Sequence, residues 1–175
     1  MEKKFVPNIV LQDCKIKFRN FRGEASKYNR AGDRNFHVIL PNEEFALKLQ
    51  EDGWNVKAKT REIDGEEVTE WTLPVAVAYY NSRGEKVRNP PRIYTYAGGI
   101  KTELGENEVK LIDSAQIKSV DLTIRPYCWE NERGNGVKAY LKNMYVTLVV
   151  DELEEKWRHI GEDDDEEENA DEIPF

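Results

Sequence analysis

The chain has 175 residues, a length typical of one domain that buries about two-thirds of its unfolded surface. Apolar residues make up 39% of the chain and charged residues 34%, and no apolar run reaches the roughly 18 residues that a membrane-spanning helix needs. The basic N-terminus is not followed by an apolar run of signal-peptide length. We therefore expect a cytoplasmic protein that has no membrane partner.

The few cysteines and histidines do not follow a metal-binding pattern. Cys14 and Cys128 lie far apart without a CxxC spacing, and His37 and His159 are the two histidines of the chain. Such a set does not supply a standard zinc site or a disulfide framework. We expect buried, reduced thiols, no metal and no cofactor.

The net charge of −8 is concentrated at the C-terminal end. Residues 161–175 contain nine acidic residues and no basic one, so residues 1–160 hold 26 basic and 34 − 9 = 25 acidic residues. Because a dense run of like charge cannot collapse, this run predicts a disordered acidic tail. Residues 1–36 hold nine basic and four acidic residues, which predicts a basic surface on the body of the protein.

The body shows period-two alternation interrupted by turn residues, which predicts a mainly β domain over residues 1–150. Residues 9–21 are predicted as one strand with Ile16 and Phe18 on a single face. The opposite face would carry Lys15, Lys17 and Arg19. A loop over residues 22–34 then leads into a strand at 35–40.

One helix is predicted in the core. Asn42 can cap its first turn, Glu43 and Glu44 favour the N-terminal end of the helix dipole, and Gly53 ends it. The Asp64–Gly65 turn that follows predicts a hairpin in which Ala58 pairs with Trp71 and Lys59 with Glu70. Trp54 and Trp71 have aliphatic neighbours on their face, so we assign them to the core rather than to a ligand platform.

A second hairpin, over residues 118–150, has one apolar face and one face of aromatic and cationic residues. With a loop at residues 131–136, the polar face would pair Trp129 with Lys138, Tyr127 with Tyr140, and Arg125 with Lys142. The alternation slips near Asn143 and Met144, which predicts a β-bulge there.

Rings interleaved with cations favour contact with single-stranded nucleic acid. Unpaired bases expose flat faces that stack on aromatic side chains, while Lys and Arg neutralise the phosphates. The alternative is an ordinary solvated sheet face. Around the hairpin, further candidate DNA contacts are Tyr94 and Tyr96 as an extension of the platform, Lys15, Lys17 and Arg19 along a phosphate path, and Arg30 and Arg34 in a loop that closes over the strand. A buried aromatic pair and solvated lysines are the competing interpretations.

The end of the chain carries a specific motif. Asp171-Glu172-Ile173-Pro174-Phe175 follows the acidic run and resembles the C-terminal tip of bacterial single-stranded DNA-binding proteins (SSBs). The resemblance implies a tip that docks replication and recombination proteins, such as a polymerase, helicase, primase or nuclease. Phe175 suits an apolar pocket, its carboxylate suits a partner Arg or Lys, and Pro174 limits the entropy lost on docking.

The body resembles the divergent SSBs of bacteriophages, which combine an elaborated OB-fold with an acidic tail. This resemblance implies an OB-fold (a Greek-key β-barrel) with one core helix over residues 1–150, a short helix over 151–160 and the tail over 161–175. It also implies a protein that coats and protects single-stranded DNA during phage replication, recombination or repair, in the host cytoplasm. A homo-oligomer is compatible with it.

Two other functions compete with DNA coating. The acidic tail would also suit a DNA mimic that occupies basic partners, and a nuclease-like enzyme is the third hypothesis. Asp163–Asp165 has no preorganised geometry for a divalent cation, and the sequence contains no P-loop and no nucleophile beside a histidine. We therefore expect no catalysis.

Overall fold

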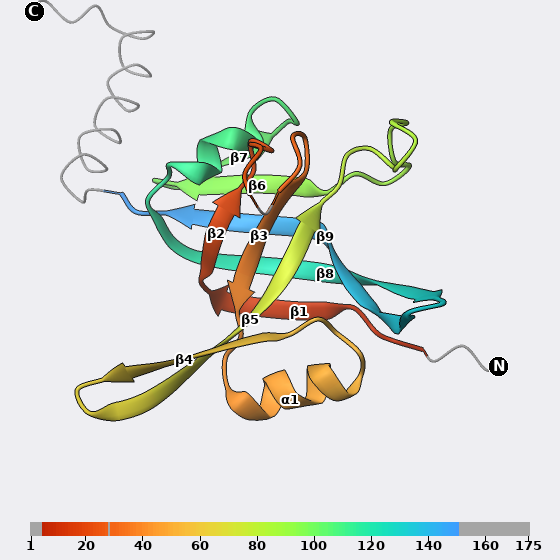
Figure 1. Ribbon diagram of the computed structural model, residues 1–175. Coiled ribbons are helices and arrows are strands. Elements are labelled where there is room, and N and C mark those ends of the chain that lie inside the picture. Colours follow the sequence, from red (N-terminus) through yellow and green to blue (C-terminus); the bar gives the residue numbers. More distant parts are fainter. Residues whose placement is uncertain (1–4, 28, 151–175) are drawn as a thin grey trace, which may run out of the picture.

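The structure is a β-barrel with a short helix at one end and two hairpins that extend beyond it (Figure 1). This computed structural model describes residues 5–27 and 29–150. Within them the chain forms, in order, β1 (Ile9–Cys14), β2 (Ile16–Asn20), β3 (Arg34–Ile39), α1 (Glu43–Glu51), β4 (Lys57–Ile63), β5 (Glu66–Val77), β6 (Arg92–Ala97), β7 (Ile100–Leu104), the 3-10 helix η1 (Val109–Asp113), β8 (Ile117–Asn131) and β9 (Gly134–Leu148). The predicted helix over 151–160 and the acidic tail lie outside the described residues.

The barrel closes through one bent strand. The hydrogen-bonded order is β1-β8-β9-β5-β3-β2, and Lys15 alone separates β1 from β2. The β5–β9 pair is parallel, whereas the other pairs along this path are antiparallel. With β1 and β2 counted as one strand, this is the connectivity of a five-stranded Greek-key barrel of the OB type. The predicted fold class, mainly β with one core helix, is confirmed.

The first strand was predicted as continuous over residues 9–21, and this is wrong. β1 pairs with β8 and β2 pairs with β3, so the chain must turn between two walls of the barrel. Asp13 and Phe18 both have left-handed backbone, with φ of 51° and 52°. Phe18 is 60% exposed and does not share a core face with Ile16.

The inside of the barrel is filled by alternate residues of its strands. Phe21 and Phe36 stack with ring centroids 5.2 Å apart, and both are fully buried, as are Val75 and Met144. Residues between these inward positions, such as Ala76, therefore point outward. This parity decides which side chains reach the outer surface of the barrel.

The predicted helix and first hairpin are confirmed. The Asn42 side chain accepts a hydrogen bond from the Phe45 N–H at 2.8 Å, and Gly53, with φ of 97°, follows the end of α1. Ala58 pairs with Trp71 and Lys59 with Glu70, as predicted. Trp54 is buried and Trp71 packs against the core.

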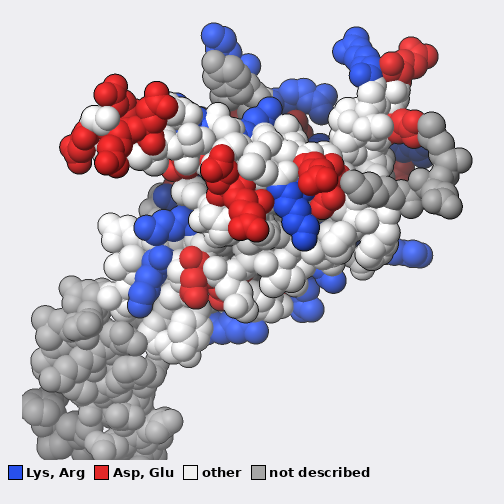
Figure 2. All heavy atoms as spheres, turned by 90° about the horizontal axis from the view of Figure 1, so that it is seen from below, with Lys and Arg blue, Asp and Glu red and all other residues white. Residues whose placement is uncertain are grey.

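The β4–β5 hairpin carries acidic side chains at its tip. Figure 2, which views the molecule from the side of α1 and this hairpin, shows acidic side chains gathered at the end of the protruding arm. Its exposed tip contains Glu62, Asp64, Glu66 and Glu67. Because these carboxylates repel phosphate, an anionic ligand is expected to bind elsewhere on the barrel.

Two additions elaborate the barrel. The β6–β7 hairpin adds to β9 through a parallel β6–β9 pair, and η1 packs beside β2. Of the helices in the described residues, neither α1 nor η1 is long and apolar enough to cross a membrane.

Candidate nucleic-acid interface

A wide groove crosses the outer face of the barrel over β2, β3, β5 and β9. Its volume is about 1760 Å³. The floor consists of outward-pointing residues, many of them small: Asn35, His37, Pro74, Ala76, Ala78 and Gly136. Small side chains leave a broad, shallow surface on which a flat ligand can lie.

The two walls of the groove are the loop between β2 and β3 and the hairpin of β8 and β9. In Figure 1 the loop stands at the top of the view and the hairpin extends to the right. In an OB barrel, oligonucleotides bind on the face of the second and third strands, between the loops that join strands 1 and 2 and strands 4 and 5. With β1–β2 counted as the first strand, those loops correspond to these two walls.

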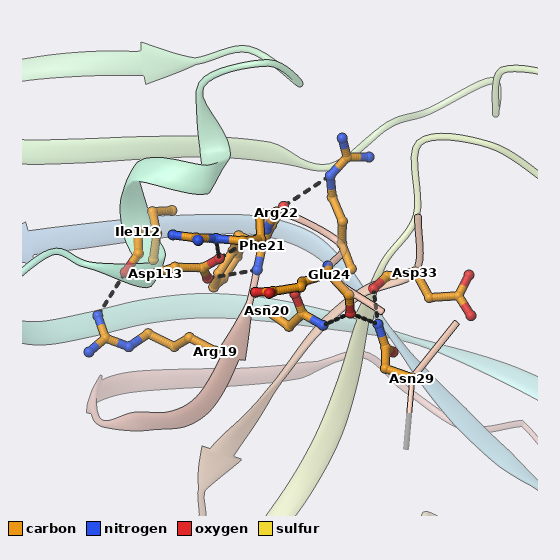
Figure 3. A network of polar contacts seen from close by, with 10 residues as sticks. Arg19, Asn20, Phe21, Arg22, Glu24, Asn29, Asp33, Ile112 and Asp113 are labelled. Atoms are coloured by element: carbon orange, nitrogen blue, oxygen red, sulfur yellow. Dashed lines mark hydrogen bonds and ion pairs between the residues drawn. The ribbon is translucent and has the colours of Figure 1, made fainter. Parts of the chain in front are cut away.

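The loop wall is held by a dense set of hydrogen bonds (Figure 3). The Asp113 carboxylate accepts from the backbone N–H groups of Phe21 and Arg22 at 2.7 and 3.1 Å, and it pairs with the Arg22 side chain at 3.1 Å. The Asn29 side-chain amide donates to the carbonyls of Glu24, Arg30 and Asp33. These hydrogen bonds tie the described part of the loop to η1 and to itself.

The loop also needs glycine at one close approach. Gly23 has φ of 70°, and a Cβ built on it would lie 3.1 Å from the backbone of Gly32. The Gly32 N–H donates to the Gly23 carbonyl at 2.8 Å. This contact joins the two ends of the loop.

The hairpin wall carries the predicted aromatic and cationic residues in a different register. Tyr127 pairs with Lys138, Arg125 with Tyr140, and Trp129 with Gly136, so the predicted pairing is wrong by two residues. The turn is shorter than predicted: Asn131 pairs with Gly134, and the Asn131 side chain accepts from the Arg133 N–H at 2.8 Å.

The shared face survives this shift because side chains alternate with a period of two. Tyr127 and Tyr140 meet edge to face with centroids 5.9 Å apart, and the Lys138 ammonium lies 5.1 Å from the centre of the Tyr140 ring. Tyr127 is 57% exposed and Trp129 38%. Trp129, Lys138 and Tyr140 line the groove.

The bulge predicted near Asn143 is also present. Thr123 pairs with Asn143 and Ile124 with Leu141, so Lys142 is the extra residue. Lys142 is exposed but does not line the groove, and neither do Arg125, Tyr127 or Lys15.

Three of the predicted cations are engaged within the protein. Lys17 forms an ion pair with Glu70, and the Arg19 guanidinium donates to the Ile112 and Ala115 carbonyls at 2.7 and 2.8 Å. Arg34, whose side chain is 18% exposed, donates to the Phe21 carbonyl, pairs with Glu106 at 3.5 Å and lies 5.2 Å from the centre of the Tyr79 ring. By contrast, Arg30 is 89% exposed at the groove, with one long ion pair to Asp33.

Tyr94 and Tyr96 lie outside the groove lining, on β6. Tyr94 stacks on Tyr145 with centroids 5.1 Å apart, and the Lys101 ammonium lies 4.5 and 5.3 Å from the two ring centres. Tyr96 is exposed beside them. These residues form a second aromatic and cationic cluster along the outer face of β9.

Phe18 and His37 are among the ring side chains of the groove that were not predicted as site residues. Phe18 lies at its edge, with its ring perpendicular to that of His37 and 5.0 Å away. Partial burial lowers the pKa of His37, and Lys17 and Lys57 lower it further by repulsion. Strand alternation assigns Phe18 to the core and contains no signal for its exposure.

The described residues contain no group of three or more His, Cys, Asp or Glu side chains that could hold a metal ion. Both cysteines are free thiols, but Cys128 is exposed, so the expectation that both are buried is wrong. Burial raises the pKa of Cys14 to about 11.

Comparisons with known proteins place the chain in a family. Residues 1–173 match a family model described as "Putative phage ssDNA-binding domain". No curated protein matches the chain. Among solved structures, it is similar to the single-stranded DNA-binding protein of bacteriophage Enc34 in complex with ssDNA, with 14% identity over 82% of this chain and 88% of that one and a TM-score of 0.48. A second similar structure is gp2.5, a single-stranded DNA-binding protein encoded by bacteriophage T7, with 12% identity over 82% of this chain and 93% of that one and a TM-score of 0.37.

The family consists of DNA-binding proteins rather than enzymes. Because the family match extends over almost the entire sequence, the chain belongs to the phage single-stranded-DNA-binding domain family.

Proposed function

We propose that single-stranded DNA lies in the groove, with its bases against the hairpin wall and its phosphates beside Lys138 and Arg30. The observation that supports this most strongly is the common surface of Trp129, Tyr127, Tyr140 and Lys138. Stacking on an aromatic ring is worth about 1–3 kcal/mol per base. Two or three such contacts account for useful affinity without any base-specific hydrogen bond.

This arrangement favours single strands over duplex. A duplex hides its base faces and presents only base edges in its grooves, so the exposed rings would find no stacking partner there. Stacking accepts any base because each base has a flat π face. We therefore expect little sequence preference.

The predicted residues outside the groove extend the path in this proposal. Arg125 and Lys142 flank the hairpin, Lys15 lies at the bend between β1 and β2, and Tyr94 and Tyr96 would receive a strand that leaves the groove along β9. Lys17, Arg19 and Arg34 would add positive potential while they hold the walls in place.

The cellular role that fits this site is coating and protecting single strands exposed during phage replication, recombination or repair. For the tip, Asp171, Glu172, Ile173, Pro174 and Phe175, we propose docking to replication or recombination proteins. A terminal Phe offers a ring and a carboxylate together, which suits an apolar pocket beside a cation. A peptide of residues 161–175 should bind the purified phage polymerase or helicase, and removal of Phe175 should abolish this binding; equal binding of both peptides would contradict the proposal.

The DNA site is tested by titration with oligo-dT and with duplex of equal length at two salt concentrations. Single strands should quench tryptophan fluorescence strongly, and their affinity should fall as salt rises because counterions are released on binding. Trp129→Phe is the control for the signal: affinity measured by the anisotropy of labelled DNA should be largely kept, while quenching falls. Equal affinity for duplex would contradict the proposed site.

A further inference from the structure

Phe18 has a backbone conformation that its side chain disfavours. Its φ is 52°, in the left-handed region where Cβ crowds the following carbonyl. Among the described non-glycine residues, Asp13 and Asp64 are the others with positive φ, and aspartate tolerates this region better than a bulky aromatic residue. Strain of this kind persists where the surrounding structure imposes it, and it is concentrated at ligand sites.

The strain turns the ring outward. The pairing of β2 with β3 shifts between Lys17 and Asn20. Because of this bulge, the Phe18 side chain does not point to the same side of the strand as Ile16, as regular alternation would require. The side chain is left 60% exposed. A local backbone strain and the exposure of a large apolar ring are both unfavourable for folding, and here they occur at the same residue.

The ring is nevertheless held in a defined position. The Lys17 ammonium lies 4.8 Å from its centre, and Lys17 is itself held by Glu70. The His37 ring stands perpendicular to it, 5.0 Å away, and His37 contacts Thr72 through a 3.2 Å hydrogen bond. Phe18 is thus an exposed ring on a fixed support.

The register of the sheet places Phe18 opposite the hairpin aromatics. Lys17 pairs with His37 and His37 with Pro74, while Ala76 pairs with Tyr140. Phe18 and Tyr140 therefore lie near the two ends of one row across the sheet. Three strand spacings, from β2 through β3 and β5 to β9, separate them by about 14 Å, several times the 3.4 Å between adjacent stacked bases.

We propose that Phe18 is a base-stacking residue that receives a second nucleobase of the same DNA strand, at the end of the groove opposite Trp129 and Tyr140. The inference rests on the proposed function, because it requires single-stranded DNA to cross the groove. The bulge in β2 presents the ring, and His37 and Lys17 orient it. The strand then runs across β2, β3, β5 and β9 rather than along one of them.

The test compares Phe18→Ala with Phe5→Ala by the anisotropy of labelled oligo-dT. Phe5 is a matched control because it is also exposed, at 86%, and does not line the groove. Phe18→Ala should weaken binding by about 5- to 150-fold, the range for loss of one base stack, whereas Phe5→Ala should change it by less than about twofold. Phe18→Leu, which keeps the bulk without the ring, should bind almost as weakly as Phe18→Ala, and Phe18→Tyr should restore affinity.

Thermal unfolding distinguishes the effect of the Phe18 backbone strain on stability from the effect of its ring on DNA binding. Glycine adopts positive φ without a penalty, so Phe18→Gly should melt about 2–4 °C above Phe18→Ala while binding DNA equally weakly. Wild-type affinity in Phe18→Ala or Phe18→Leu, or failure of Phe18→Tyr to restore binding, would overturn the inference. If the wild-type protein does not bind oligo-dT, the proposed function itself fails; if Trp129→Ala weakens binding but Phe18→Ala does not, the assignment of Phe18 alone fails.

Discussion

Gly136 allows the Trp129 indole to lie against the backbone of β9. A Cβ built on Gly136 would approach three indole atoms, Cζ2, Cε2 and Nε1, at 2.9, 3.0 and 3.1 Å. Ordinary contacts begin at 3.4 Å, so Gly136→Ala should displace the ring by about 0.5 Å or more. The backbone of Gly136 does not have a positive φ, so alanine itself is accommodated without strain.

The size of the effect follows from the contact that is lost. A gap of 0.5–1 Å removes about a quarter to a half of a van der Waals well, and one base stack is worth about 1–3 kcal/mol. Gly136→Ala should therefore weaken oligo-dT binding by about 0.3–1.5 kcal/mol, or roughly 2- to 12-fold. Trp129→Ala, which removes the ring, sets the upper limit. The melting temperature should change little because the ring is partly exposed.

A double-mutant cycle tests the cause. If Gly136 acts only through the ring, then Gly136→Ala should have no further effect in a Trp129→Ala background, within about 0.3–0.5 kcal/mol. The assay is the anisotropy of labelled oligo-dT, with tryptophan emission as a report on the ring. An equal loss in both backgrounds would refute the reasoning, because it would mean that alanine acts through the backbone of β9.

Three further predictions concern charge and pH. Lys138→Met should lower the slope of log K against log salt by about 0.7, as expected for one phosphate contact on a single strand, whereas Lys17→Met should leave the slope nearly unchanged because Lys17 is paired with Glu70; equal changes would contradict the distinction. At pH 8 a thiol reagent should modify Cys128 quickly and Cys14 only after unfolding, since Cys14 is partly buried with its pKa raised to about 11, and Cys128→Ser should remove the fast phase. The pKa of His37 is lowered from 6.5 by burial and by nearby lysines, so the unfolded chain takes up a proton first and stability should fall as the pH drops below about 6.5. Chemical denaturation at pH 7.5 and 5.5 should show a smaller loss for His37→Gln, and an identical loss would count against this role.

Local signals in the sequence determined much of this protein. The Asn42 cap and the Asp64–Gly65 turn depend on neighbouring residues, and each has its predicted outcome. The alternation along residues 118–150 correctly predicted a hairpin with a bulge, but not the register of its two strands. The aromatic and cationic face of the hairpin was predictable for the same reason. Its members keep their side of the sheet even though the pairing is shifted by two residues.

Only the tertiary structure decided how the groove is built. The bend that closes the barrel, and the bulge that exposes Phe18, arise because one stretch of chain must pair with β8 at one end and with β3 at the other. The partners of the basic residues are equally remote: Lys17 meets Glu70, 53 positions away, and Arg19 meets Ile112, 93 positions away. Alternation along a strand specifies the side on which a residue lies, whereas contacts between distant segments decide whether its charge or ring is left for a ligand.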